Sequence, residues 1–188
     1  MPTPALYSPL ARLFEYPDAD YAVRARECLG AMRGQHREAA ALCERFHAGI
    51  CGLNTGELQE LYTQTFDLNP TCALEVGWHL YGEDYHRGAF LVKMRQQMRD
   101  HGVSESSELP DHLSNALRLL ERLEPDEGAA FASEYLLPAL DRMRAACPQV
   151  QSNAFAALLE AAFLLLGSRY PYQPVPLRIP MSELRVLP

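Results

Sequence analysis

The sequence predicts an all-α protein, a single helical bundle of about eight or nine helices followed by an extended tail. Apolar residues recur at spacings of three and four along nearly the whole chain, and the strict alternation of a half-buried strand is almost absent. Proline is concentrated after residue 167, where it prevents a helix from continuing. We therefore predict a helical domain over residues 1–167 and an extended Pro-rich tail over residues 168–188.

The first half of the chain contains four predicted helices, at residues 5–14, 21–32, 39–53 and 58–66. The third has an apolar face at helical spacing that includes Phe46 and Ile50. The fourth follows Asn54, whose side chain caps a helix together with Glu57 three residues later in the pattern of a capping box.

The second half continues with predicted helices at residues 84–102, 113–123, 127–147 and 152–166. Asp84 is placed to cap the first of these, and Gly102 to end it. Pro138 should kink the third, because proline removes a backbone donor and crowds the preceding turn. The last is apolar nearly all round, which predicts a central position in the bundle. The polar loop at residues 102–107 is a candidate hinge.

Composition excludes several classes of function. The net charge is −7 and Lys93 is the only lysine, which argues against binding nucleic acid. Five widely spaced cysteines without a Cys-x-x-Cys pattern favour reduced thiols in the cytoplasm. No signal peptide is recognisable, and the longest apolar run, at residues 154–166, is shorter than the roughly 20 residues that span a bilayer. We expect a cytoplasmic protein.

The distribution of charge is more informative than its sum. No lysine or arginine occurs between Arg45 and Arg87, or from Asp100 to Leu117, while both stretches carry several carboxylates. The simplest interpretation is an acidic surface that keeps the protein soluble. The alternative is a face that attracts a peptide with a basic end and an apolar continuation, where aromatic side chains supply the affinity.

The segment Glu108-Leu-Pro110-Asp111-His112 supports two interpretations. It resembles a helix start, with Pro110 in the first turn and Asp111 against the positive helix end. It also projects a carboxylate and an imidazole beside a loop, where they can hold an arginine or a backbone group of a peptide. Acid–base catalysis by Asp111 and His112 is disfavoured, because no Gly-x-Ser-x-Gly motif or catalytic cysteine signature accompanies them.

A second candidate group precedes this segment. Glu75, Trp78 and Tyr81 fall at helical spacing and mix polar with aromatic character, which is common at binding surfaces and also in ordinary packing. Arg87 is expected to form a salt bridge with Glu75, Glu83 or Asp84. Gly88 is expected to permit a close approach between helices.

Cys43, His47 and Cys51 recur at intervals of four residues and would share one helix face. Such spacing can supply metal ligands, so a small helical metal-binding or cofactor-binding protein is the alternative function. Cys43 also belongs to the apolar face of its helix, and free cysteine usually behaves as a small buried hydrophobe. Core packing is the preferred interpretation.

Three motifs occur in order: Glu57-Leu-x-x-x-Tyr62-x-x-x-Phe66-Asp67, then Tyr81-Gly82-Glu83 leading to Arg87-Gly88, then Glu108-Leu-Pro-Asp-His-Leu113. Together they resemble the redox-enzyme maturation chaperones of the TorD/DmsD/NarJ type. The similarity spans about residues 5–167 and is greatest to the NarJ branch, the nitrate reductase delta subunit or molybdenum cofactor assembly chaperone.

The resemblance implies an all-helical chaperone with no catalytic activity and no cofactor of its own. Its partner would be the N-terminal leader, often of the twin-arginine type, of the apo catalytic subunit of nitrate reductase or a related oxidoreductase of the DMSO reductase family. The chaperone would hold that subunit for molybdenum cofactor insertion during anaerobic respiration. A monomer or a domain-swapped dimer is expected, because the loop at residues 102–107 would allow helix exchange.

In relatives the Asp-His pair and nearby aromatic residues affect leader binding, and this role carries over to Asp111 and His112. The residues predicted to bind the client are Tyr62, Phe66, Glu75, Trp78, Tyr81, Glu108, Pro110, Asp111 and His112. Arg87 and Gly88 are predicted to belong to a structural motif.

Overall fold

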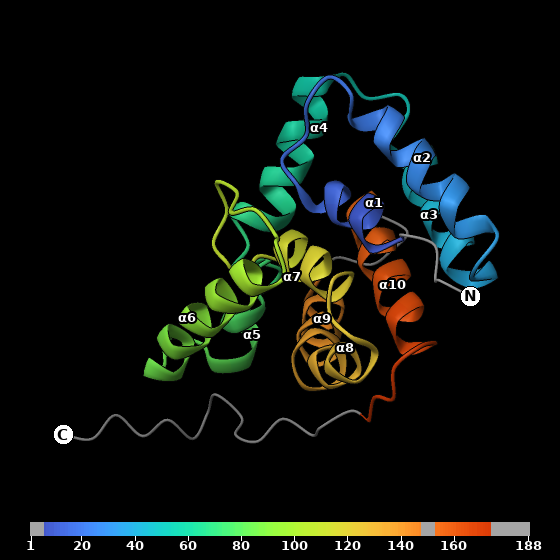
Figure 1. Ribbon diagram of the computed structural model, residues 1–188. Helices are drawn as coiled ribbons and strands as arrows, with labels where there is room; N and C mark the ends of the chain where they lie inside the picture. The colour runs from blue at the N-terminus through green and yellow to red at the C-terminus, as the bar shows by residue number, and fades with distance from the viewer. Residues whose placement is uncertain (1–5, 148–152, 174–188) are drawn as a thin grey trace.

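The computed structural model describes residues 6–147 and 153–173, and within these ranges the chain is helical and contains no strand (Figure 1). The predicted all-α class is confirmed. The elements are α1 (Tyr7–Ala11), η1 (Arg12–Phe14), α2 (Tyr21–Arg33), α3 (Arg37–Ile50), α4 (Thr55–Tyr62), η2 (Thr63–Asp67), α5 (Val76–Tyr81), α6 (Tyr85–Asp100), α7 (Leu113–Leu120), α8 (Pro125–Phe131), η3 (Ala132–Leu136), α9 (Leu137–Ala146) and α10 (Ala154–Gly167).

Two π-helical turns occur: η3 lies within a longer helix, and η2 ends one. The segment η3 joins α8 to α9 without a break, so this helix runs from Pro125 to Ala146. The π turn precedes Pro138, whose missing N–H and bulky ring prevent regular pairing with the preceding turn. The disturbance predicted at Pro138 therefore takes the form of a wider turn. The segment η2 extends α4 through Phe66 and Asp67.

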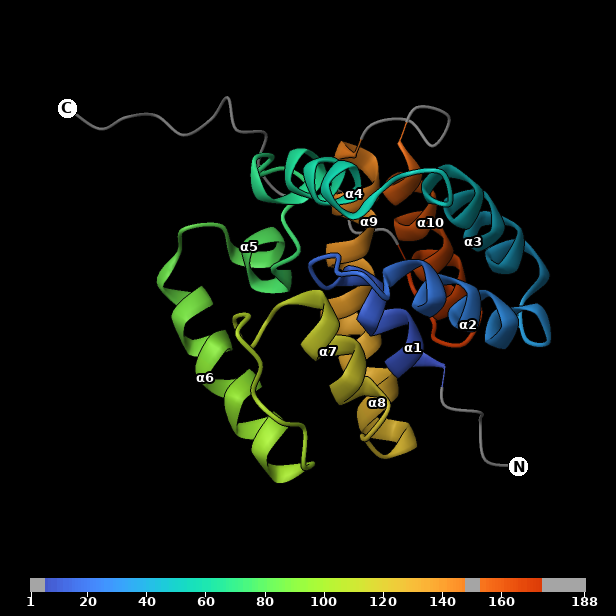
Figure 2. The ribbon, with the colours of Figure 1, turned by 90° about the horizontal axis from the view of Figure 1, so that it is seen from above.

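Helix α10 is central, as its nearly uniform apolar sequence predicts. It packs against α3 on one side and α9 on the other, and α2 in turn packs on α3 (Figure 1). Seen from above, α5 and α6 lie on the side of the bundle away from α2 and α3, with α1 and α7 between them (Figure 2). Helix α5 contacts both α6 and α9.

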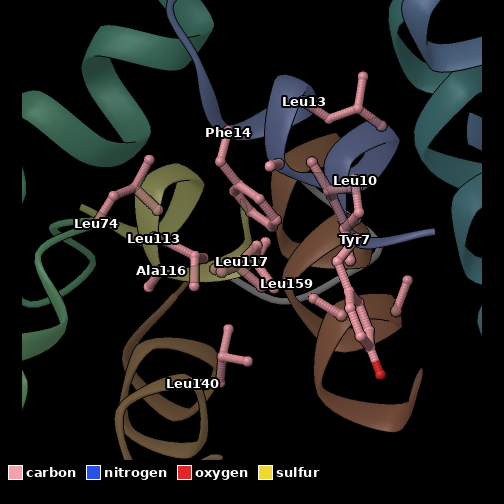
Figure 3. Packing of buried hydrophobic residues seen from close by; sticks show 14 of the residues in the cluster. Tyr7, Leu10, Leu13, Phe14, Leu74, Leu113, Ala116, Leu117, Leu140 and Leu159 are labelled. Carbon is pink, nitrogen blue, oxygen red and sulfur yellow. The ribbon is translucent and has the colours of Figure 1, made fainter. Parts of the chain in front are cut away.

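The core joins segments that are far apart in the sequence. Phe14 of η1 points toward Leu117 of α7, and Leu13, Leu113 and residues of α9 and α10 belong to the same cluster (Figure 3). Leu74, in the segment before α5, packs into this cluster as well. Burying this apolar surface is the main stabilising contribution to the fold, at about 25 cal/mol for each Å² removed from water.

The predicted helix ends are mostly confirmed. Asn54 accepts a hydrogen bond from the Glu57 N–H while Glu57 accepts one from the Asn54 N–H, which completes the capping box of α4. Asp84 caps α6 by accepting from the His86 N–H at 2.8 Å. Gly102 follows α6 with φ of +66°, a conformation that glycine adopts without strain.

The loop after α6 is anchored at several points. Glu105 forms salt bridges with Arg95 and Arg99, at 3.6 and 3.3 Å. Val103 is buried, and the Ser106 hydroxyl donates to Asn115 Oδ1 at 3.2 Å. These contacts hold the loop against α6 and α7. Exchange of helices between protomers through this loop stays a prediction.

The chain beyond α10 packs back on the bundle as far as it is described. The Tyr172 hydroxyl donates to Asp141 at 2.8 Å, and its ring packs edge-on against Phe163. The Ser133 hydroxyl donates to the Pro171 carbonyl at 2.8 Å. The predicted extended tail lies mostly at residues 174–188, outside the described residues. Within the described part of the chain, no helix has both the length and the apolar character needed to cross a membrane.

Candidate functional site

A cleft of about 520 Å³ opens where η2, the segment before α5 and the start of α7 meet. Six of the residues predicted to bind a client line it: Tyr62, Phe66, Glu75, Trp78, Glu108 and His112. Arg87 and Tyr16 complete the lining with Asp67, Pro70, Ala73 and Leu74. Motifs that are separated by more than 30 residues therefore form one site.

Backbone hydrogen bonds join two of these motifs directly. The Leu113 N–H donates to the Leu74 carbonyl at 2.8 Å, and the Val76 N–H donates to the Asp111 carbonyl at 2.9 Å. Glu75 and His112 form the antiparallel bridge between them. The start of α5 and the start of α7 are thus fixed to each other, which sets the positions of Trp78 and His112 across the cleft.

Asp111 is fully buried and does not line the cleft, in contrast to the exposed carboxylate that the sequence suggested. Its Oδ2 accepts a hydrogen bond from the Gly77 N–H at 2.9 Å, at the start of α5. Its Oδ1 is buried without a hydrogen-bond partner in the described residues. Burial raises the pKa of the carboxyl, and the Gly77 hydrogen bond and the Arg87 charge partly oppose this. Asp111 therefore serves to position α5, not α7.

His112 begins α7 and keeps one ring nitrogen for the cleft. Its Nδ1 accepts from the Ser114 N–H at 3.3 Å and lies 2.8 Å from the Ser114 hydroxyl, so the ring proton is on Nε2. Burial, with a smaller contribution from the Arg118 charge, lowers the pKa of His112 to about 4. The imidazole is neutral at physiological pH, and its Nε2–H has no acceptor within the described residues.

Pro110 lies before His112, outside the first turn of α7, so its predicted place in that helix is wrong. His112 takes the capping position instead, because its ring nitrogen accepts the exposed Ser114 N–H. Pro110 is buried and does not line the cleft. Tyr81 also lies away from the cleft, where its ring packs against Phe90 and His86.

The aromatic residues of the cleft differ in exposure. Tyr62 and Phe66 are nearly completely buried, with their ring centroids 5.0 Å apart, and the Tyr62 hydroxyl donates to the Phe14 carbonyl at 2.8 Å. They form the floor. Tyr16 is 49% exposed and Trp78 is half-buried, so these two rings are the accessible apolar walls. The sequence did not identify Tyr16, because it follows η1 outside any helical pattern.

Three carboxylates, Asp67, Glu75 and Glu108, line the cleft, and none forms a salt bridge within the described residues. Partial burial raises the pKa of Glu108, and the charges of Glu75, Asp67 and Glu15 raise it further. Glu15 itself is paired with Arg118. A cation placed among the three cleft carboxylates would relieve their mutual repulsion.

Arg87 forms none of the predicted salt bridges in the described part of the molecule. Its guanidinium lies over the Trp78 ring, 5.5 Å from the centroid, and its Nε is buried without a hydrogen-bond partner there. A guanidinium over an indole face is favourable, so Arg87 supports the wall that Trp78 forms.

The close approach predicted at Gly88 occurs at Gly77 instead. A Cβ at Gly88 would meet nothing within 4 Å, whereas one at Gly77 would lie 2.7 Å from Asp111 Oδ2 and 2.9 Å from Phe90 Cδ1. Gly77 thus allows α5 to pack against Asp111. A glycine within a short helix beside a tryptophan is the signal that sequence reasoning passed over.

Cys43, His47 and Cys51 do not form a metal site. Cys43 is buried beside Cys28, whereas Cys51 is exposed at the end of α3. Across residues 6–147 and 153–173, no three His, Cys, Asp or Glu side chains gather closely enough to hold a metal ion. The interpretation of Cys43 as a core residue is confirmed.

Comparison with known proteins identifies the family. The model of the family described as nitrate reductase delta subunit matches residues 33–160, more than half of the chain. The chain belongs to the nitrate reductase delta subunit family. The predicted family resemblance is therefore confirmed.

Two curated proteins resemble this chain in sequence, and one solved structure resembles it in fold. The nitrate reductase molybdenum cofactor assembly chaperone NarJ of Escherichia coli strain K12 is 29% identical over 163 residues, covering 85% of this chain and 68% of NarJ. The protein of the same name from strain O157:H7 matches equally. A candidate redox enzyme maturation protein from Archaeoglobus fulgidus aligns with a TM-score of 0.60 and 20% identity, over 87% of this chain and 93% of that one, which supports the fold.

Proposed function

We propose that this protein is an assembly chaperone for the catalytic subunit of a nitrate reductase or a related molybdoenzyme, and that it binds the N-terminal leader of the apo subunit in the cleft. The observation that carries this proposal is the convergence of three carboxylates, which form no salt bridge within the described residues, with the accessible rings of Tyr16 and Trp78. Family membership and the name of the E. coli relative support the client class.

The chemistry of the cleft suits a basic peptide. Asp67, Glu75 and Glu108 would attract arginine side chains, and a guanidinium forms strong hydrogen bonds with carboxylates. The neutral His112 Nε2–H would donate to a backbone carbonyl of the peptide. Leu68 and Leu109, 73% and 45% exposed, adjoin Asp67 and Glu108 in the sequence and add apolar surface near the rim.

Binding of the leader would act indirectly on cofactor insertion. The chaperone would occupy the leader, in the cytoplasm, and keep the subunit from export and complex assembly until the molybdenum cofactor is loaded. The cleft itself is acidic, which does not suit an anionic, phosphorylated cofactor. The cofactor would therefore be bound by the client and not by the chaperone.

The test is a calorimetric titration with a synthetic peptide that copies the leader of the nitrate reductase catalytic subunit of the same organism. Replacing Glu75 and Glu108 together by glutamine should weaken binding by about tenfold or more, equivalent to at least about 1.4 kcal/mol. The control is Glu38→Gln with Glu134→Gln, which removes the same charge from exposed positions outside the cleft. Equal affinity of the two double variants would refute the proposed site.

A further inference from the structure

A second hollow lies beside the cleft, on the far side of Trp78. It has a volume of about 810 Å³, and Pro70 and Trp78 line both hollows. The second hollow, here called the α9 groove, is lined further by Gly82 after α5, by Pro138, Ala145 and Ala146 of α9, and by Tyr172. Helices α5 and α9 contact each other and lie side by side (Figure 2).

Charged groups at the α9 groove are already paired within the protein. Asp141 forms a salt bridge with Arg144 at 2.8 Å and accepts the Tyr172 hydroxyl at 2.8 Å. Arg142 donates to the His79 carbonyl. His79 Nε2 lies 2.6 Å from the Ala73 carbonyl, and burial lowers the pKa of this imidazole, which favours its neutral form. The surface that remains for a ligand is mainly apolar.

The two hollows therefore select opposite chemistry. The cleft presents carboxylates without salt-bridge partners, which favour a cation, and the α9 groove presents apolar side chains, which disfavour any charge. Trp78 separates them as a fixed ridge, because its Nε1–H donates to the Pro70 carbonyl at 2.8 Å and Arg87 lies over its ring.

We propose that the cleft and the α9 groove form one continuous peptide-binding surface. The basic segment of a bound peptide lies in the cleft, the chain crosses Trp78, and the following apolar segment lies against Pro138, Ala145 and Ala146. This inference rests on the proposed function and adds the direction of the peptide: its N-terminal side lies near Glu75 and Glu108, and it runs toward α9. Two observations carry it: Pro70 and Trp78 line both hollows, and the cleft is acidic where the α9 groove is mainly apolar.

The decisive variant is Ala145→Glu, at an exposed position on α9, titrated with the leader peptide. An added carboxylate attracts a basic peptide at long range, so weaker binding would have to arise from the bulk and charge of the new side chain against the apolar segment. We expect a loss of about tenfold or more. Ala41→Glu, at an exposed position on α3 outside both hollows, is the control and should bind like the unchanged protein. Circular dichroism verifies that both variants fold.

A second peptide, whose apolar segment is replaced by serines, completes the test. It should bind more weakly than the leader peptide and should not distinguish Ala145→Glu from the unchanged protein, since the affected contact is gone. Unaltered affinity of the leader peptide for Ala145→Glu would overturn the inference while leaving the proposed function intact. No binding of the leader peptide to the unchanged protein would overturn both.

Two alternative interpretations of the α9 groove predict different outcomes in these experiments. If Leu109→Ser lowers the affinity for the leader peptide and Ala145→Glu does not, the apolar segment of the peptide lies at the cleft rim and the inference is wrong. A dimer of the unchanged protein that dissociates on Ala145→Glu, in size-exclusion chromatography with light scattering, would assign the α9 groove to a second copy and would also overturn it.

Discussion

Replacing Gly77 by alanine tests how α5 is held in place. The new Cβ would lie 2.7 Å from Asp111 Oδ2 and 2.9 Å from Phe90 Cδ1, whereas ordinary contacts begin at 3.4 Å. Both neighbours are buried, so neither can rotate into solvent. If the carboxylate retreats by the roughly 0.7 Å required, its 2.9 Å hydrogen bond from Gly77 exceeds normal hydrogen-bond length.

The expected cost combines two opposite effects. Loss of a hydrogen bond to a charged acceptor costs about 1.5–3 kcal/mol. Alanine has a higher helix propensity than glycine, which stabilises the folded protein by up to about 1 kcal/mol. The free energy of unfolding should therefore fall by about 2 kcal/mol, which corresponds to a decrease in melting temperature of about 4–8 °C for a chain of this length.

Urea denaturation followed by far-UV circular dichroism measures this difference, and Gly88→Ala is the matched control. Gly88 is exposed within α6 and a Cβ there meets nothing within 4 Å, so alanine should stabilise the protein by about 0.5–1 kcal/mol. Gly77→Ala with the same stability as the unchanged protein, or a similar loss in both variants, would refute the close packing of α5 against Asp111.

Two further predictions concern the carboxylates of the site. Leader affinity should fall as the pH is lowered below neutral, because the raised pKa of Glu108 means that this carboxylate loses its charge at a higher pH than an ordinary glutamate does. His112, with a pKa of about 4, stays neutral over this range, so Glu108→Gln should flatten the profile, and an unchanged slope would contradict this cause. Asp111→Ala should lower the free energy of unfolding by about 1–3 kcal/mol, because it leaves the Gly77 N–H buried and unpaired. Asp111→Asn keeps an acceptor for the Gly77 N–H, so this variant should lose less stability than Asp111→Ala. It should also bind the leader peptide like the unchanged protein in calorimetry. A loss of binding without a loss of stability would instead indicate direct contact between Asp111 and the client.

Local sequence determined most of the helices of this protein. The spacing of apolar residues predicted α2, α3, α4, α6, α7 and α10, and the side chains of Asn54 and Asp84 fixed two helix starts. These features depend on hydrogen bonds and packing within a few residues, which a sequence displays directly. The uniform apolar character of α10 also predicted its central place.

The sequence also indicated which segments form the site but not how each side chain is used. Glu75, Trp78, Glu108 and His112 line one cleft, because the motifs that contain them pair through their backbones, and their predicted contact with the client stays a prediction. The direction of the Asp111 carboxylate was decided by Gly77, 34 residues away in the sequence.

Only the tertiary structure decided the roles of Asp111, Arg87 and Gly88, and it added Tyr16 and Gly77 to the site. Three of these residues depend on a partner in another element or segment: Asp111 on the α5 backbone, Arg87 on the Trp78 ring and Tyr16 on Tyr62. A buried carboxylate binds whichever donor the fold brings to it, since leaving it unpaired is costly. Helical periodicity reports which face of a helix is buried, and it contains no information about which atoms of another segment that face will meet.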